Sequence, residues 1–228
     1  EINVTINDVE ENINAPSFTS NATFTADENQ TAIGTVTATD PEGDSITFTI
    51  SGNELSITSA GVLTFVSAPD YEAKSSYSAT VTASDGTNST TQDITVNVNN
   101  VNDNSPSFTS NTTFTADENQ TAIGTVTATD ADGDNVTFTV SGSELAITSA
   151  GVLTFVSAPD YETKTTYTAT LTASDGTNET NQEINVTIND VEENINAPSF
   201  TSNATFTADE NQTAIGTVTA TDPEGDSI

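Results

Sequence analysis

The sequence predicts an all-β protein made of tandem β-sandwich domains, each with about seven strands. Three observations lead to this prediction. The chain of 228 residues repeats itself at a period near 90, which is long enough for a domain with its own core. Within each copy, apolar and polar residues alternate at period two, which is typical of strands. No segment of ten or more residues has the 3.6-residue period of a helix.

A nearly invariant stretch defines the repeat. It begins at Phe18, Phe108 and Phe200, at steps of 90 and 92 residues, and the second copy differs from the first only by Thr112 in place of Ala22. Residues 183–228 are identical to residues 1–46, so we expect a window of a longer array whose larger unit is two domains and 182 residues long. The predicted parts are the last strand of a preceding repeat plus linker (1–14), two complete repeats (15–104 and 105–196) and the N-terminal part of a further repeat (197–228).

The strands of the central copy follow from the alternation. Apolar positions share one face in three longer runs, which include Phe138, Leu171 and Val186. Shorter runs lie around Phe114 and at 123–128, 145–147 and 152–155. Thr, Val and Ile dominate all of these runs, as a half-buried pleated surface favours. The stretches DADGD, SAG and SDGTNE between them have the composition of turns.

The composition points to cations as partners. The chain has 34 acidic residues against two lysines, a formal charge of -32, and such self-repulsion favours bound cations and disfavours nucleic acid. It has no Cys and no His, which excludes disulfides, a thiol nucleophile and Cys- or His-based metal sites. The sequence contains no run of about 18 apolar residues, so it predicts no membrane-spanning helix. We therefore expect no nucleic-acid partner and no membrane insertion.

The acidic residues cluster in turns and in the joint between copies. Carboxylate, amide and backbone oxygens are the ligands that Ca²⁺ takes, six to eight at a time. The same residue types also make ordinary solvated turns, and spacing alone leaves both interpretations open. The DADGD stretch resembles the start of a helix-loop-helix calcium loop, but position twelve is Ser141 and no helices flank it. Paired carboxylates can hydrolyse glycosides, yet these acids recur in every copy with no His or Cys, so we predict no enzyme.

Five motifs in a consistent order resemble those of cadherin repeats. NVNDNSP (100–106) resembles the cadherin linker motif Asp-x-Asn-Asp-Asn-x-Pro. ADEN, TDAD, DYE and ASDG resemble the early glutamate, the Asp-x-Asp, the Asp-x-Glu and the Ala-x-Asp of that family. The chain is most similar to bacterial cadherin-like domains of very large surface adhesins. This resemblance implies a Greek-key, cadherin/immunoglobulin-like sandwich with up to three calcium ions in each joint.

The resemblance also implies a ligand set. At the central joint it comprises Glu28, Asp70 and Glu72 from one repeat, Asn100, Asn102, Asp103 and Asn104 from the linker, and Asp130, Asp132 and Asp175 from the next repeat. The matching positions of the other joints are Asp8, Glu11, Asp40, Glu42, Asp85, Glu118, Asp160, Glu162, Asp190, Glu192, Glu193, Asp222 and Glu224.

The other joints depart from the motif. Counted back from proline, Ile13 and Ile195 stand where the linker aspartate belongs, whereas counting forward from Asp8 places Glu10 and Glu11 there. We favour the forward count for the carboxylates, because an Ile at the centre of a calcium joint would remove its shared ligand. We therefore predict two alternating joint types that differ in ion number, affinity or bend.

Two functions from different classes remain. One is a calcium-rigidified extracellular spacer, stalk or filament of a cell-surface adhesin, in which adjacent repeats and calcium ions are the partners. The other is an adhesive module that contacts identical chains side by side or a glycan. The near-identity of the copies favours the spacer, because a spacer can be multiplied whereas a recognition surface tends to be one specialised domain.

Overall fold

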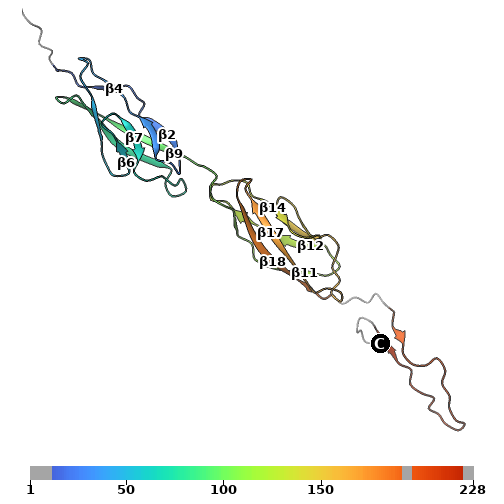
Figure 1. The fold of residues 1–228 in the computed structure, drawn as a ribbon. Helices are drawn as coiled ribbons and strands as arrows, with labels where there is room; N and C mark the ends of the chain where they lie inside the picture. Colours follow the sequence, from blue (N-terminus) through green and yellow to red (C-terminus); the bar gives the residue numbers. More distant parts are fainter. Residues whose placement is uncertain (1–11, 192–196, 223–228) are drawn as a thin grey trace, which may run out of the picture. The chain divides into compact units, whose positions relative to one another are not determined.

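The computed structural model describes residues 12–191 and 197–222, and Figure 1 shows their strands. These residues form two compact units. Among the described residues, the first comprises 12–106 together with 130–135, and the second comprises 107–129, 136–191 and 197–222. All regular structure in the described part is β-strand, and no helix there has the length and apolarity needed to cross a bilayer. The prediction of an all-β fold is confirmed.

The first repeat contains nine strand segments. These are β1 (Ser17–Phe18), β2 (Thr23–Asp27), β3 (Ala32–Thr35), β4 (Ala38–Thr39), β5 (Thr47–Ile50), β6 (Leu55–Ile57), β7 (Val62–Phe65), β8 (Ser76–Ser84) and β9 (Ser89–Asn99). The sequence predicts about seven strands, and two of the nine segments, β1 and β4, are only two residues long. A register shift between Ala32 and Gly34 interrupts the pairing of β3 with β7.

Two sheets build this sandwich. One has the order β2-β9-β8-β5, the other has the order β3-β7-β6, and β1 and β4 form a separate two-stranded pair. The pair β2–β9 is parallel and the remaining pairs are antiparallel. Sequential strands therefore cross repeatedly between the sheets, which is the Greek-key arrangement.

The second repeat has the same topology. Its segments are β10 (Ser107–Phe108), β11 (Thr113–Asp117), β12 (Ala122–Thr125), β13 (Ala128–Thr129), β14 (Thr137–Val140), β15 (Leu145–Ile147), β16 (Val152–Phe155), β17 (Thr166–Ser174) and β18 (Glu179–Asn189). The sheets have the orders β11-β18-β17-β14 and β12-β16-β15.

The core of each repeat consists of the apolar positions that alternate along the strands. In the second repeat Leu153, Leu171 and Val186 are completely buried, and Phe155 packs edge-on against Tyr167 with ring centroids 5.0 Å apart. Their polar neighbours along β17 and β18 face away from the core, as the period-two pattern predicts. The acidic turns thus lie at the ends of strands whose positions are fixed by a packed core.

Residues 197–222 contain one short strand pair, β19 (Ser199–Phe200) with β20 (Ala220–Thr221). Its register repeats that of β10 with β13. Phe200 is 78% exposed, whereas the equivalent Phe108 packs against the core of its repeat.

Candidate metal centre

A buried glutamate follows the first long strand of each repeat. Glu28 is only 3% exposed, and its carboxylate accepts the backbone N–H of Tyr71 at 2.7 Å and that of Val101 at 2.8 Å. Glu118 is equally buried and accepts the N–H groups of Tyr161 and Val191 at the same distances. Each glutamate therefore joins the Asp-Tyr-Glu turn of its repeat to the segment that leaves the last strand.

Asn29 turns the chain immediately after Glu28. Its φ of 62° is left-handed, a conformation that asparagine tolerates better than most residues. Its N–H donates to the carbonyl of Pro69 at 3.0 Å, and its side-chain amide donates to the Asp103 carboxylate. Asn119 has the same conformation and the same backbone bond, to Pro159. The motif Asp-Glu-Asn thus orients the glutamate inward and places an amide beside the linker.

Four carboxylates converge in the first unit. Glu28, Glu72, Asp103 and Asp132 each offer one oxygen, and these oxygens all lie within 4.8 Å of one another. Asp132 belongs to the loop 130–135, which is part of this unit. Carboxylates this close repel one another unless a proton or a cation lies between them. The cluster therefore has the donor set of a hard cation, because only oxygen ligands are present.

Asn104 connects the linker to Asp132. Its backbone N–H donates to Oδ2 of Asp132 at 2.9 Å, and its side-chain amide donates to Oδ1 at 3.0 Å. The N–H of Asp103 also donates to Oδ2 of Asp132, at 3.1 Å, and the side chain of Asn100 donates to the Asp132 carbonyl at 2.8 Å. These bonds hold the loop 130–135 against the linker.

The pKa values in this cluster move in opposite directions. Burial raises the pKa of Glu72, and the negative charge of Glu28 and a shared hydrogen bond with Asp132 raise it further. For Asp132, burial also acts upward, but the hydrogen bonds from Asn104 outweigh it and lower the pKa. Glu72 therefore binds a proton more readily than Asp132 does.

Three further acidic groups have oxygens within 4.8 Å of one another. They are Glu118 with Asp160 and Glu162, Asp40 with Glu42 and Asp44, and Asp130 with Asp132 and Asp134. The first repeats the arrangement around Glu28 in the second unit. The other two lie in the DPEGD and DADGD loops, where Oδ1 of Asp40 and of Asp130 accepts N–H groups from its own loop.

Three buried carboxylate oxygens in the described part of the chain have no hydrogen-bond partner. They are the Oδ2 atoms of Asp40, Asp85 and Asp130. An unpartnered buried oxygen of a charged group is costly, and a cation is the partner that would satisfy it. All three belong to residues that the cadherin resemblance names as calcium ligands. The oxygens present thus fit a calcium ion.

The remaining predicted ligands have various surroundings. Asp70 uses Oδ1 to accept the N–H of Ala73 at 3.1 Å. Oδ1 of Asp85 accepts two backbone N–H groups, and although burial acts upward, these bonds hold its pKa below the ordinary value. Asp175 accepts the equivalent two bonds, and Asn102 is half-buried in the linker. Asp190 and Asp222 belong to none of the carboxylate groups found among the described residues.

Asp44 and Asp134 join clusters although the sequence analysis did not name them as ligands. Each ends the five-residue loop that begins at Asp40 or Asp130, and this spacing was a usable signal. The predicted ligands Asp8, Glu11, Glu192, Glu193 and Glu224 lie outside the described residues.

The first linker has an isoleucine where the central linker has an aspartate. Asn14 donates its backbone N–H and its side-chain amide to Glu42, as Asn104 does to Asp132. The count back from proline therefore aligns these asparagines. Ile13 occupies the position of Asp103 and is 69% exposed. Because Glu10 and Glu11 lie outside the described residues, the forward count for the carboxylates stays a prediction.

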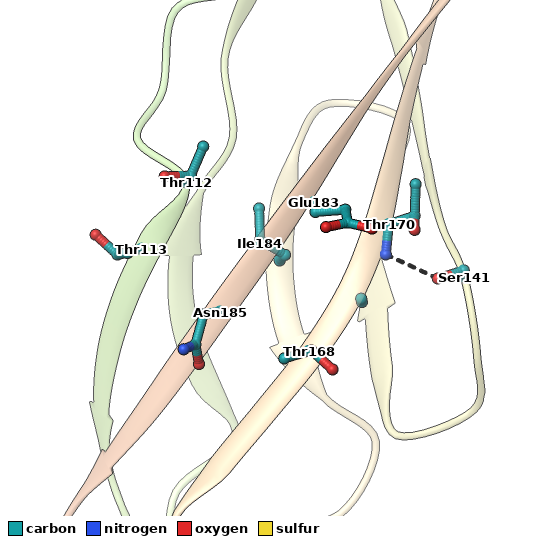
Figure 2. Close-up of a pocket in the computed structure, with 9 residues that line it drawn as sticks. Thr112, Thr113, Ser141, Thr168, Thr170, Glu183, Ile184 and Asn185 are labelled. Carbon is teal, nitrogen blue, oxygen red and sulfur yellow. Dashed lines mark hydrogen bonds between the residues drawn. The ribbon is translucent and has the colours of Figure 1, made fainter.

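A polar hollow of about 520 Å³ lies on the second repeat (Figure 2). Residues of β17 and β18 line it together with Thr112, Thr113 and Ser141, whose Oγ accepts the N–H of Thr170 at 2.8 Å. Glu183 is its one carboxylate. Glycoside hydrolysis needs two facing carboxyl groups, so this hollow does not support that reaction.

Comparisons with known proteins agree with this fold. A family profile described as Bacterial Ig domain matches residues 13–99. Cadherin EGF LAG seven-pass G-type receptor 2 of Mus musculus is 34% identical over 225 residues, which cover 87% of this chain and 8% of that receptor. Protocadherin Fat 4 of Mus musculus is 35% identical over 190 residues, which cover 72% of this chain and 4% of that protein. The chain thus spans less than a tenth of the length of these relatives.

Among solved structures, mouse cadherin-23 EC22-24 superimposes with a TM-score of 0.72 at 24% identity, over 94% of this chain and 80% of that one. This likeness concerns the fold. Together with the sequence relatives and the strand order of both repeats, it identifies the chain as a series of cadherin-like repeats.

Proposed function

We propose that these repeats bind calcium at their joints and serve as a stiffened extracellular spacer, stalk or filament of a bacterial cell-surface adhesin. The observation that carries the proposal is the convergence of Glu28, Glu72, Asp103 and Asp132 in a chain with almost no positive charge. The chain has only two basic residues, Lys74 and Lys164, and each is paired with a glutamate elsewhere. A bound metal ion is the remaining source of neutralising charge.

Calcium would supply that charge without demanding a strict geometry. Its six to eight oxygen ligands can combine carboxylates with linker amide and backbone oxygens, as this site offers. Glu28 and Glu72 would hold it from the repeat, Asp103 from the linker and Asp132 from the loop 130–135. An ion that binds only the ordered joint stabilises it by about 2.7 kcal/mol when its concentration is 100 times Kd. Extracellular modules work at roughly 0.1–1 mM affinity, which suits an environment outside the cell.

Small-angle scattering of the full chain tests this function. We expect the maximum dimension to become larger and better defined in millimolar calcium than in chelator, because an ordered joint restricts bending. Sodium chloride of matched ionic strength serves as the control for simple charge screening. A distance distribution that is the same in calcium and in chelator would overturn the stiffening role, and calorimetry without any calcium heat would overturn binding itself.

A second candidate function is adhesion between identical chains. Val62 and Val66 of the first repeat are 45% and 58% exposed, and Val152 and Val156 of the second repeat have nearly the same exposure. Such recurring apolar side chains on a surface are suited to contact with another copy. Sedimentation of the chain over a hundredfold concentration range in calcium checks this, and a constant monomer mass would argue for the spacer alone.

A further inference from the structure

Each lysine of the chain makes the same set of three contacts. The ammonium group of Lys74 lies 2.5 Å from Oε1 of Glu54 and 4.3 Å from the centroid of the Tyr77 ring. The backbone N–H of Lys74 donates to the Asp70 carbonyl at 2.9 Å. In the second repeat Lys164 has the corresponding contacts with Glu144, Tyr167 and Asp160, at 2.6, 4.3 and 2.9 Å. In so acidic a chain, both positive charges serve one local arrangement.

This lysine ends the turn that carries two of the predicted calcium ligands. The turn from Asp70 to Lys74 includes Glu72, and the N–H of Tyr71 within it donates to the buried Glu28. Asp70 caps the turn by accepting the N–H of Ala73. The position of Glu72 therefore depends on where this short turn is held, and Lys74 is its last residue.

The partners of Lys74 are fixed to the core of the repeat. The carbonyl of Glu54 accepts the N–H of Val66 at 2.9 Å, and the next residue, Leu55, is buried in the core. Tyr77 lies on β8 and packs edge-on against Phe65 with ring centroids 5.1 Å apart. The lysine side chain thus connects the ligand turn to two elements that cannot move without disturbing the core.

These contacts contribute little to global stability. The side chains of Lys74 and Glu54 are 44% and 51% exposed, and an exposed ion pair changes an equilibrium by no more than about fivefold. An exposed cation–π contact contributes a further factor of about two to five. Interactions of this size are nevertheless large enough to select one position of a short surface turn over others.

We propose that Lys74 and Lys164 are positioning residues that hold the Asp-Tyr-Glu turn in the geometry required for calcium binding. The inference deepens the proposed function and rests on it. By holding the turn, the lysine would raise the calcium affinity of the site. Its charge alone would lower that affinity, because a nearby positive charge repels calcium. Positioning and electrostatics therefore predict different signs, which makes the two separable.

Two substitutions that both break the ion pair provide the test. Lys74→Met removes a positive charge and keeps the apolar stem, whereas Glu54→Gln removes a negative charge at nearly constant shape. If Lys74 positions the turn, both variants lower the calcium affinity of the central site, by up to about fivefold when only the ion pair is lost and by up to about 25-fold when the cation–π contact is lost as well. If only charge matters, Lys74→Met strengthens calcium binding and Glu54→Gln weakens it, and the proposal is wrong.

The measurement is a calcium titration of the full chain followed by the amide signals of Tyr71 and Val101, which both donate to Glu28. Lys74→Arg retains both contacts and should restore the affinity. Lys164→Met is the matched control, because the central site takes its ligand turn from the first repeat, and it should leave this titration unchanged.

A second readout needs no calcium. In chelator, the Tyr71 amide should exchange with solvent faster in Lys74→Met and in Glu54→Gln than in the wild type, while core amides of β8 keep their protection. Unchanged exchange in both variants would overturn the proposal. If the wild type itself binds no calcium, the proposed function fails, whereas wild-type binding with unaltered variants refutes the positioning role alone.

Discussion

The backbone N–H of Tyr71 lies 2.7 Å from Oε2 of Glu28, although the two residues are 43 positions apart in the chain. Glu28 also accepts the N–H of Val101, so one buried carboxylate satisfies two donors from separate segments. The second repeat builds the same arrangement around Glu118. The glutamate is therefore both a structural acceptor and a candidate metal ligand.

Replacing Glu28 by Gln should weaken both its role as a structural acceptor and its role as a candidate metal ligand. The Gln amide nitrogen would face one of the two N–H donors, and we expect the calcium-free first repeat to lose about 1–3 kcal/mol of unfolding free energy. Calcium affinity at the central site should fall as well, because a carboxylate is lost. Urea unfolding in chelator and a calcium titration measure the two effects. Glu118→Gln should destabilise the second repeat and spare the central site, and equal effects of both variants on that site would contradict this assignment.

Calcium binding should release protons at a pH just above the ordinary pKa of Glu72. The pKa of Glu72 is raised above its ordinary value of 4.5, so between that value and the raised pKa the folded, calcium-free chain holds a proton that the unfolded chain has lost. The contribution of Glu72 to the unfolding free energy therefore falls as pH rises through this window. Calcium displaces the proton, so its affinity rises with pH over the same window.

Calorimetry in two buffers of different ionisation enthalpy measures this proton release. The released amount should be largest at a pH just above 4.5 and should decline as the pH rises through the raised pKa of Glu72, above which this carboxyl is ionised with or without calcium. Glu72→Gln should lose most of the release, although Asp132 keeps its lowered pKa. A heat of binding that is the same in both buffers just above pH 4.5 would argue against a proton held by Glu72.

The linker aspartate should account for the difference between joint types. Asp103→Ile gives the central linker the residue that stands at Ile13, and we expect calcium affinity there to fall at least about tenfold, a loss of roughly 1.4 kcal/mol. Asp103→Asn keeps an amide oxygen and should lose less. Titrations of both variants measure the order. If Asp103→Ile binds calcium like the wild type, Asp103 is not a ligand, and the two joints must differ for another reason.

Alternation of apolar residues was sufficient to predict the strands. Successive side chains of a strand point to opposite faces, so every second residue, such as the buried Leu171, faces the core. The register shift between Ala122 and Gly124 in the pairing of β12 with β16 was not predicted, because a bulge leaves no mark in the period-two pattern. The ordered acidic motifs led to Glu28 and Asp132. The burial of Glu28 by two backbone donors and the contacts of Lys74 were not predicted, because they depend on segments far apart in the sequence.

Gly151 offers a test of the fold that is independent of metal. Its φ is 87°, and a Cβ at this position would lie 2.2 Å from the carbonyl oxygen of Val126. This distance is a steric clash, so the backbone would have to move to admit a side chain. Gly142 has a similar φ of 83° but no atom within 4 Å of the corresponding Cβ position. The pair therefore separates the cost of left-handed backbone from the cost of a steric clash.

Gly142→Ala should lose about 1–2 kcal/mol of unfolding free energy, the penalty of a left-handed alanine. Gly151→Ala should lose more than about 4 kcal/mol, because the backbone of Val126 must also move. Urea unfolding in chelator, followed by far-ultraviolet circular dichroism, measures both losses. Since Gly61 of the first repeat is unchanged, the Gly151→Ala chain should unfold in two steps, with the later step at the wild-type midpoint. Equal losses in the two variants would mean that the backbone of Val126 can move away from a side chain at position 151 at no cost, despite the 2.2 Å separation.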